Sequence, residues 1–145
     1  MTNAEALELF KDKDLSAQTL EELSEDENQF VRVRVAAHLN TSSQTLMKLS
    51  KDESEYVREF VAEHHNTPVE TLVALSEDPL LAYWIGGNPN TPLEILQKLS
   101  EDTDANIRAS VAVNPKTPKE ILAKLKSDEN EDVRTAVAKN PSSNN

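Results

Sequence analysis

The chain contains no cysteine, and only two of its 145 residues are glycine. Without cysteine it has no disulfide, no thiolate zinc site and no cysteine-held iron–sulfur cluster. No apolar run approaches the roughly 18 residues that span a membrane. The first residues, MTNAEALELFKDKD, lack the basic start and apolar core of a signal peptide. We therefore expect a soluble, cytoplasmic chain with no membrane partner.

Positive charge is also scarce, because 15 basic residues stand against 26 acidic ones, for a net charge of −11. A surface this acidic repels phosphate backbones, so we expect no nucleic acid partner. A basic protein or peptide suits this negative electrostatic field better, although high negative charge also simply keeps a protein soluble. The few glycines, together with many leucine, alanine, glutamate and lysine residues, favour helix.

The sequence is dominated by an internal repeat, which is clearest in NPNTPLEILQKLSED (88–102) and NPKTPKEILAKLKSD (114–128). The segments 15–26, 41–52 and 67–78 follow the same template. Paired leucines mark the five copies at 20/23, 46/49, 72/75, 96/99 and 122/125, in steps of 26, 26, 24 and 26 residues. Chance does not produce five copies in register, so the chain is a repeat protein.

Each copy predicts two short helices separated by a polar turn. The leucine pairs give the first helix its apolar face, and a second segment such as ANIRASVAV (105–113) follows the turn. In FVRVRVAA (30–37) apolar and polar residues alternate as in a strand, but the alignment with the other copies favours helix. The first helices are expected to begin with a threonine N-cap, a proline and a glutamate that completes a capping box. The threonines are Thr67, Thr91 and Thr117.

A helix pair of about 25 residues cannot bury its own apolar face, so neighbouring pairs must stack into a solenoid. We therefore predict a single all-α repeat domain over residues 1–145. Its parts are an N-terminal cap at 1–14, repeats at about 15–40, 41–66, 67–90, 91–116 and 117–141, and a frayed tail at 142–145.

These repeats resemble the leucine-rich repeat variant family, whose repeats carry the pattern D…VRxxVAxNPxTPxxxLxxL. The residues that carry the resemblance are Asp102, Ile107-Arg108, Val111-Ala112, Asn114-Pro115, Thr117-Pro118, Leu122 and Leu125. The resemblance implies an all-helical, right-handed superhelix related to HEAT and armadillo solenoids, in which some segments are 3₁₀ rather than α. Some members hold an iron–sulfur cluster on N-terminal cysteines. Because this chain has no cysteine, we expect no cofactor, and the remaining implication is an interaction role.

Aspartate and arginine recur six residues apart along the repeats. The pairs are Asp26/Arg32, Asp52/Arg58, Asp102/Arg108 and Asp128/Arg134. One interpretation is a row of arginines that grips carboxylates or phosphates of a ligand. The other is a structural ladder, in which each arginine bridges to the aspartate of its own or the next repeat. We favour the ladder, because a job that every repeat needs explains the regular recurrence.

Histidines and acidic turns offer no catalytic or metal signature. His38 and His64 align with Asn88, Asn114 and Asn140, where the second segment ends, so they are interpreted as C-terminal caps. The pair His64-His65 lacks metal-site spacing, and the acidic turns lack that of an EF-hand. We predict no catalytic, cofactor or metal site, and a chain that is not an enzyme.

The aromatic residues are distributed unevenly, because five of the six lie in the second segments of the first three copies. We predict that they form a protein- or peptide-binding surface on the concave face of the solenoid. The residues are Phe30, Arg34, Tyr56, Phe60, Tyr83 and Trp84, with His64 nearby. Packing between repeats is the alternative role for the aromatics. A nucleic-acid-binding HEAT-like protein and a small-ligand site in the third copy are the alternative functions.

The third copy breaks the repeat rule within DPLLAYWIGG (78–87), where the second segment is two residues short. Either Trp84 or Ala82 replaces the ladder arginine, depending on where the gap is placed. Gly86-Gly87 replace the usual ending, and glycine weakens a helix. The sequence allows this window to be a binding site or a structural kink, and it leaves the partner and the oligomeric state open.

Overall fold

The computed structural model describes residues 1–144, and every element within that range is a helix. It divides into two compact units, the first at Met1–Thr71 and the second from Leu72 onward. The boundary falls inside one short helix. The predicted all-α fold with stacked repeats is confirmed. The single domain over 1–145 and the right-handed superhelix stay predictions.

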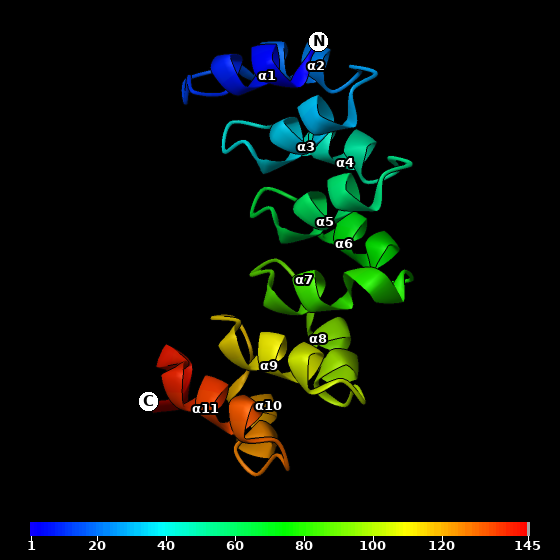
Figure 1. Cartoon of the computed structure of the whole chain (residues 1–145). Coiled ribbons are helices and arrows are strands. Elements are labelled where there is room, and N and C mark those ends of the chain that lie inside the picture. Colours follow the sequence, from blue (N-terminus) through cyan, green and yellow to red (C-terminus); the bar gives the residue numbers. More distant parts are fainter. Residues whose placement is uncertain (145) are drawn as a thin grey trace. The chain divides into compact units, whose positions relative to one another are not determined.

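The first unit contains the N-terminal helix and the first two repeats. Its helices are α1 (Asn3–Leu9), α2 (Ala17–Leu23), α3 (Gln29–Ala37), α4 (Ser43–Leu49) and α5 (Glu55–Glu63), and α6 (Val69–Leu75) crosses into the second unit. The second helices α3 and α5 lie side by side, with α1 against α3 (Figure 1). The strand-like segment 30–37 is therefore helical, as its alignment predicted, because Val31 and Val35 share the buried face of α3.

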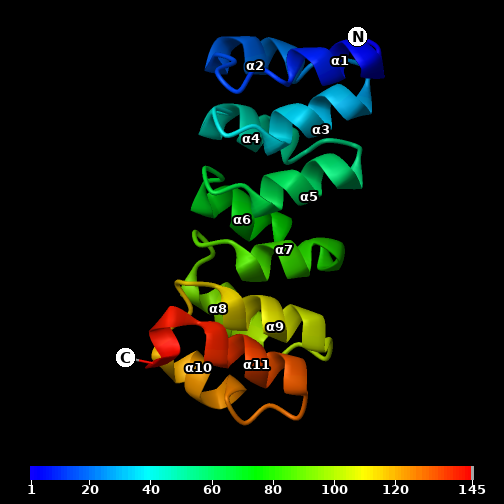
Figure 2. The same cartoon turned by 60° about the vertical axis from the view of Figure 1, so that its left-hand side comes forward.

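The second unit holds the remaining repeats. Its helices are η1 (Pro79–Leu81), α7 (Ala82–Gly87), α8 (Leu93–Ser100), α9 (Ala105–Val113), α10 (Lys119–Leu125), α11 (Glu131–Lys139) and η2 (Pro141–Asn144). Here α9 lies between α7 and α11 and packs on both (Figures 1 and 2). The 3₁₀ helices η1 and η2 bear out the expectation that some segments are 3₁₀. Residues 142–144, predicted to be frayed, belong to η2, and Asn145 lies outside the described residues.

The core consists of the leucine pairs and one apolar face of each second helix. Leu20, Leu46, Leu72, Leu96 and Leu122 are at most 2% exposed, and so are Val31, Val35, Val57, Val61, Ile85 and Val111. Burying one such side chain stabilises the fold by about 1.5–3 kcal/mol. Each apolar face is covered in part by the next repeat, which is why the repeats depend on their neighbours.

The threonine N-caps predicted for the first helices are wrong. Helices α8 and α10 have Pro92 and Pro118 at the N-cap, and no side chain caps either helix. The preceding threonines are buried and donate their hydroxyls backward, to carbonyls near the end of the previous second helix. The bonds run from Thr67 to Val61, from Thr91 to Ile85 and from Thr117 to Val111, each at 2.6 Å.

Where serine replaces the proline, the cap does form. Ser16 accepts a bond from the backbone of Thr19, and Ser42 from that of Thr45. A full capping box occurs only in α1 among the helices whose caps are described, between Thr2 and Glu5. The glutamates assigned to capping boxes, such as Glu94, lie in the first helical turn, where the helix dipole favours a negative charge.

Candidate functional site

Each second helix turns the same positions toward the solvent, which follows from the helical period. Counted back from the residue that ends each helix, positions 1, 5 and 8 are exposed or half-buried, while positions 2, 3 and 7 pack inward in most repeats. Position 4 joins the exposed set in the first three repeats. We call positions 1, 4, 5 and 8 the open face. The residues that end the helices are His38, His64, Asn88, Asn114 and Asn140.

In the first unit the open face carries four of the predicted contact residues. The guanidinium carbon of Arg34 lies 5.0 Å from the ring centroid of Phe30, one turn earlier on α3, in a cation–π arrangement. On α5, Tyr56 is 63% exposed and Phe60 is 36% exposed. Large aromatic side chains left this open on a helix whose opposite face is buried are candidates for contact with a partner.

A hollow adjoins these aromatic residues in the first unit. Its lining residues are Ala37, Leu39, Phe60, Glu63, His64 and His65. Leu39 is 71% exposed, and the sequence analysis did not single it out. Leu39 directly follows the residue that ends α3, and in the last three repeats the equivalent position is proline. A leucine in place of this proline was the sequence signal that could have identified it.

His64 was predicted to lie near the contact surface, and it forms part of the wall of the hollow while only 6% exposed. Its Nδ1 accepts a bond from the backbone N–H of Asn66 at 3.0 Å, and its Nε2 lies 3.0 Å from the carbonyl oxygen of His38. Since Nδ1 is the acceptor, Nε2 carries the proton and donates. Burial lowers the pKa of His64, against the opposing effect of the bond to His38. The ring thus joins two repeats.

In the second unit, asparagine takes the same place. The side-chain amide of Asn114 donates to the carbonyls of Gly86 and Asn88, at 2.8 and 2.7 Å. Asn140 donates to those of Ala112 and Asn114, at 2.7 and 2.9 Å. The side chains of His64, Asn114 and Asn140 therefore satisfy backbone carbonyls of the preceding repeat, a role that the cap interpretation described only in part.

The other two predicted contact residues, Tyr83 and Trp84, lie in the second unit and pack edge to face, with ring centroids 5.1 Å apart. Tyr83 is 48% exposed. The structure therefore groups the predicted residues into a first-unit set and a second-unit set. On α9 and α11 the open face has no aromatic side chain, and there Ser110 and Ala136 are buried at position 4.

Two of the predicted arginine–aspartate ladder positions form bidentate ion pairs between consecutive repeats. Arg32 binds Asp52 through Nε at 2.7 Å and Nη2 at 3.1 Å. Arg108 binds Asp128 in the same way, at 2.8 and 2.9 Å. The bond from Arg108 lowers the pKa of Asp128. Burial raises the pKa of Asp52, but the bonds from Arg32 and from the backbone of Ser54 outweigh this effect. The pKa of Asp52 is therefore lowered as well.

All four ladder arginines also donate Nη1 to two backbone carbonyls of their own repeat. For Arg58 these belong to Asp52 and Glu53, at 2.8 and 3.2 Å, and for Arg134 to Asp128 and Glu129, at 2.7 and 3.0 Å. Arg32 bonds Asp26 and Glu27, and Arg108 bonds Asp102 and Thr103. The carboxylate of Asp26 pairs instead with the Met1 ammonium, at 3.2 Å. These contacts support the structural interpretation of the ladder, which stays a prediction.

The structure also locates the gap in the third repeat. Helix α7 is six residues long, whereas α3, α5, α9 and α11 have nine, but η1 and α7 together span the nine residues 79–87. The prediction that the second segment is two residues short is therefore wrong, because the two missing residues fall in the turn, directly after Asp78. Counted from the end of the helix, Ala82 occupies the ladder position and Trp84 the open face. Gly86 is buried, and a Cβ placed on it would lie 2.1 Å from Ser110 Oγ on α9. The glycine therefore permits close packing of the two helices.

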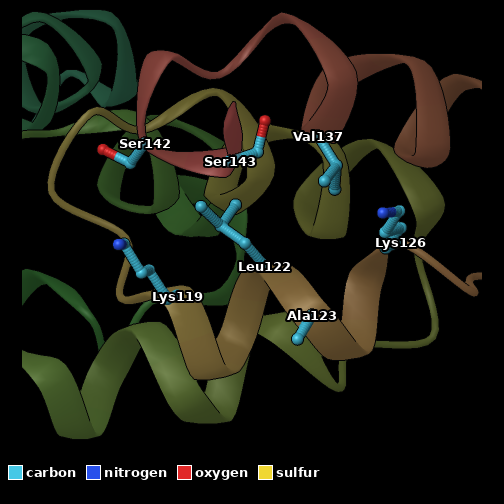
Figure 3. A pocket seen from close by; sticks show the side chains of 7 residues that line it. All are labelled: Lys119, Leu122, Ala123, Lys126, Val137, Ser142 and Ser143. Atoms are coloured by element: carbon cyan, nitrogen blue, oxygen red, sulfur yellow. The ribbon is translucent and has the colours of Figure 1, made fainter. Parts of the chain in front are cut away.

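A further hollow lies between α10, α11 and η2 (Figure 3). Its lining residues are Lys119, Leu122, Ala123, Lys126, Val137, Ser142 and Ser143. Within residues 1–144 no three histidine or acidic side chains are grouped so as to hold a metal ion. In the same range, no helix is long and apolar enough to cross a membrane.

Comparison with known proteins agrees with this geometry. Residues 57–80 match the model of the family described as leucine rich repeat variant. A solved structure described as a leucine-rich repeat variant with a novel repetitive protein structural motif aligns with 94% of this chain, at 22% identity and a TM-score of 0.61.

The chain spans 60% of the length of that protein, and at this identity the likeness shows the fold alone. No curated protein matches the chain. A leucine rich repeat variant solenoid is a scaffold type, in which successive helix pairs present a continuous surface.

Proposed function

We propose that this leucine rich repeat variant chain is a non-enzymatic module that binds a protein or peptide through the open faces of α3 and α5 in its first unit. The observation that supports this most directly is the exposure of Tyr56 and Phe60 on α5, a helix whose opposite face is buried. Solenoids bind extended partners along such surfaces. Tyrosine and tryptophan dominate the energetics of many interfaces, because they bury much area at low entropic cost.

The proposed partner is basic. Residues 1–71 contain fifteen acidic and seven basic side chains, a balance of −8. The first-unit hollow adds Glu63 beside Phe60, so that an aliphatic stem could lie on the ring while its positive head reaches the carboxylate. The same balance disfavours a nucleic acid, whose phosphates it would repel.

The proposal is tested by selecting peptides from a displayed random library on the purified chain and measuring their affinity for variants. The double variant Tyr56→Ala/Phe60→Ala should weaken binding by at least about tenfold, since two exposed anchors are removed. Both side chains are exposed, so circular dichroism should show an unchanged helix content.

The matched control is Asn106→Ala/Thr135→Ala, which changes open-face positions on α9 and α11 that are also exposed. It should leave the affinity unchanged. Selected peptides that bind the Tyr56/Phe60 variant as tightly as the original chain would show that the partner uses another surface.

A further inference from the structure

The ladder repeats contain a defined site for a guanidinium group. In the second unit, Arg108 donates Nε and Nη2 to the carboxylate of Asp128 in the next repeat, and Nη1 to two backbone carbonyls of its own repeat. The same aspartate also accepts a bond from the backbone of Asn130, at 2.9 Å, which fixes its orientation. In the first unit, Arg32, Asp52 and Ser54 repeat this arrangement.

Between the third and fourth repeats the carboxylate of this site is present but the arginine is not. Asp102 has the same local geometry as Asp128, since its Oδ1 accepts a bond from the backbone of Asp104 at 2.8 Å. The ladder position on α7, however, is Ala82, whose side chain ends at Cβ. Among the described residues, no basic side chain forms an ion pair with Asp102.

A hollow lies where that arginine would be. It has a volume of about 410 Å³, and Ala82 and Asp102 are both in its lining. The other lining residues are Ser76, Glu77, Pro79, Lys98, Leu99 and Ile107. It thus combines apolar walls, which suit an aliphatic stem, with two carboxylates and one lysine. The volume falls within the range of roughly 300–1,000 Å³ that is common for ligand sites.

We propose that this hollow binds the side chain of an arginine supplied by a partner protein, whose guanidinium replaces the missing ladder arginine at Asp102. The chain's own ion pairs are the evidence for the chemistry, because Asp52 and Asp128 hold guanidinium groups in this way. A planar guanidinium fits a carboxylate bidentately, whereas an ammonium cannot, so arginine is preferred to lysine.

A protein is the proposed source, rather than free arginine, because of the charges in the hollow. Lys98 is the only basic residue in the lining, beside Glu77 and Asp102, so the hollow has no built site for the α-carboxylate of free arginine, whereas an arginine within a chain carries none. The proposal goes beyond the open face and does not depend on it. Its failure would leave the proposed function standing.

The experiment titrates the isotopically labelled chain with N-acetylarginine amide and follows backbone amide shifts by NMR. N-acetyllysine amide, N-acetylcitrulline amide and free arginine are titrated in parallel. We expect the arginine amide to shift residues around Asp102 and Ala82 and to bind most tightly. Equal binding of the citrulline amide would contradict a charged guanidinium site, and equal binding of free arginine would contradict the protein source.

Three substitutions test the location of the site. Asp102→Asn keeps the bond from Asp104 but removes the charge, and should weaken binding at least about tenfold. Lys98→Gln removes a competing cation and should strengthen it. Glu94→Gln, an exposed change on α8 outside the hollow, should have no effect. Unchanged affinity in the Asp102 variant would overturn the proposal.

Ala82→Arg supplies the missing side chain from the chain itself. It should abolish binding of the arginine amide and raise the midpoint of thermal unfolding, because the new guanidinium fills the hollow and pairs with Asp102. Retained binding in a folded Ala82→Arg variant would show that the probe binds elsewhere. Should this variant not fold, the Asp102 and Lys98 variants still decide the question.

Discussion

At the scale of single residues, the fold depends on side chains that join one repeat to the next. Gly86 is one of them, because α7 and α9 approach so closely that a Cβ there would lie 2.1 Å from Ser110 Oγ and 3.3 Å from Val111 Cγ2. The corresponding residues between α9 and α11 are Ala112 and Ala136, both buried. Both pairs, glycine opposite serine and alanine opposite alanine, are small enough to let neighbouring second helices pack closely.

This packing gives a prediction that can be tested by a double-mutant cycle. Gly86→Ala should lower the free energy of unfolding by roughly 1–2 kcal/mol, because Ser110 must turn away and give up its bond to the Ile107 carbonyl. Adding Ser110→Ala should recover most of the loss, since it recreates the alanine pair. Gly87→Ala is the control, because nothing lies within 4 Å of its Cβ, and it should be stabilising by up to about 1 kcal/mol. Equal effects at both glycines in urea unfolding would contradict the packing account.

His64 gives a second prediction at this scale, concerning pH. Its folded pKa lies below the ordinary value of about 6.5. As the pH falls below that value, the unfolded chain takes up a proton that the folded chain does not. The contribution of His64 to stability is therefore complete above about pH 6.5 and is lost as the pH falls from there to the lowered folded pKa. The charges of neighbouring His65 and His38 also lower the pKa of His64.

The variant His64→Asn isolates this effect, because asparagine makes the equivalent bonds at positions 114 and 140. Urea unfolding at pH 7.5 and 5.5 should show a smaller difference in the free energy of unfolding for this variant than for the original chain. His65→Asn changes an exposed ring and should retain most of the difference. A pH dependence unaffected by His64→Asn would assign it to other groups.

At the scale of elements, the ladder attaches α3 and α9 to the turn of the following repeat. Arg108 on α9 bonds the carboxylate of Asp128, in the turn before α11, and is 8% exposed. Arg134 on α11 is exposed, and its described bonds go to carbonyls of its own repeat. The two arginines thus make the same local bonds but differ in burial and in the contact to the next repeat.

We predict that Arg108→Lys lowers the free energy of unfolding by about 1–3 kcal/mol, because lysine keeps the charge but loses the bidentate geometry. Arg134→Lys should change it by less than about 0.5 kcal/mol, as is usual for exposed positions. Chemical denaturation of the two variants under the same conditions gives the comparison. Similar losses at both positions would mean that the bidentate pair adds little to stability.

The elements could be predicted well because their signal recurs. Five leucine pairs in register fixed the helix pairs, and comparison between copies corrected the strand-like pattern in α3. The threonine role was missed because a threonine followed three residues later by glutamate has the form of a capping box, while the bond that forms instead goes to the preceding repeat. Similarly, the sequence left open where the two-residue deletion of the third repeat falls, and so whether Ala82 or Trp84 takes the ladder position. The residue at which α7 ends decides this. Contacts between repeats, unlike the helices themselves, are not encoded within one copy.

At the scale of the whole molecule, different parts of the chain differ in their charge and in the side chains that their second helices expose. Residues 1–71 hold most of the negative charge and the aromatic residues of α3 and α5, whereas α9 and α11 present small and polar side chains on the open face. The sequence predicted which aromatic residues to examine, because their uneven distribution was visible. It could not show that His64 is buried or that Leu39 is exposed, since both depend on how neighbouring repeats cover them.

The most direct test of the proposed function is to map the binding of a selected peptide on the labelled chain by NMR. The account predicts that the amide shifts concentrate on the open faces of α3 and α5, around Phe30, Tyr56 and Phe60, and that α9 and α11 change little. Shifts centred on the open face of α9 and α11, with α3 and α5 unaffected, would contradict it.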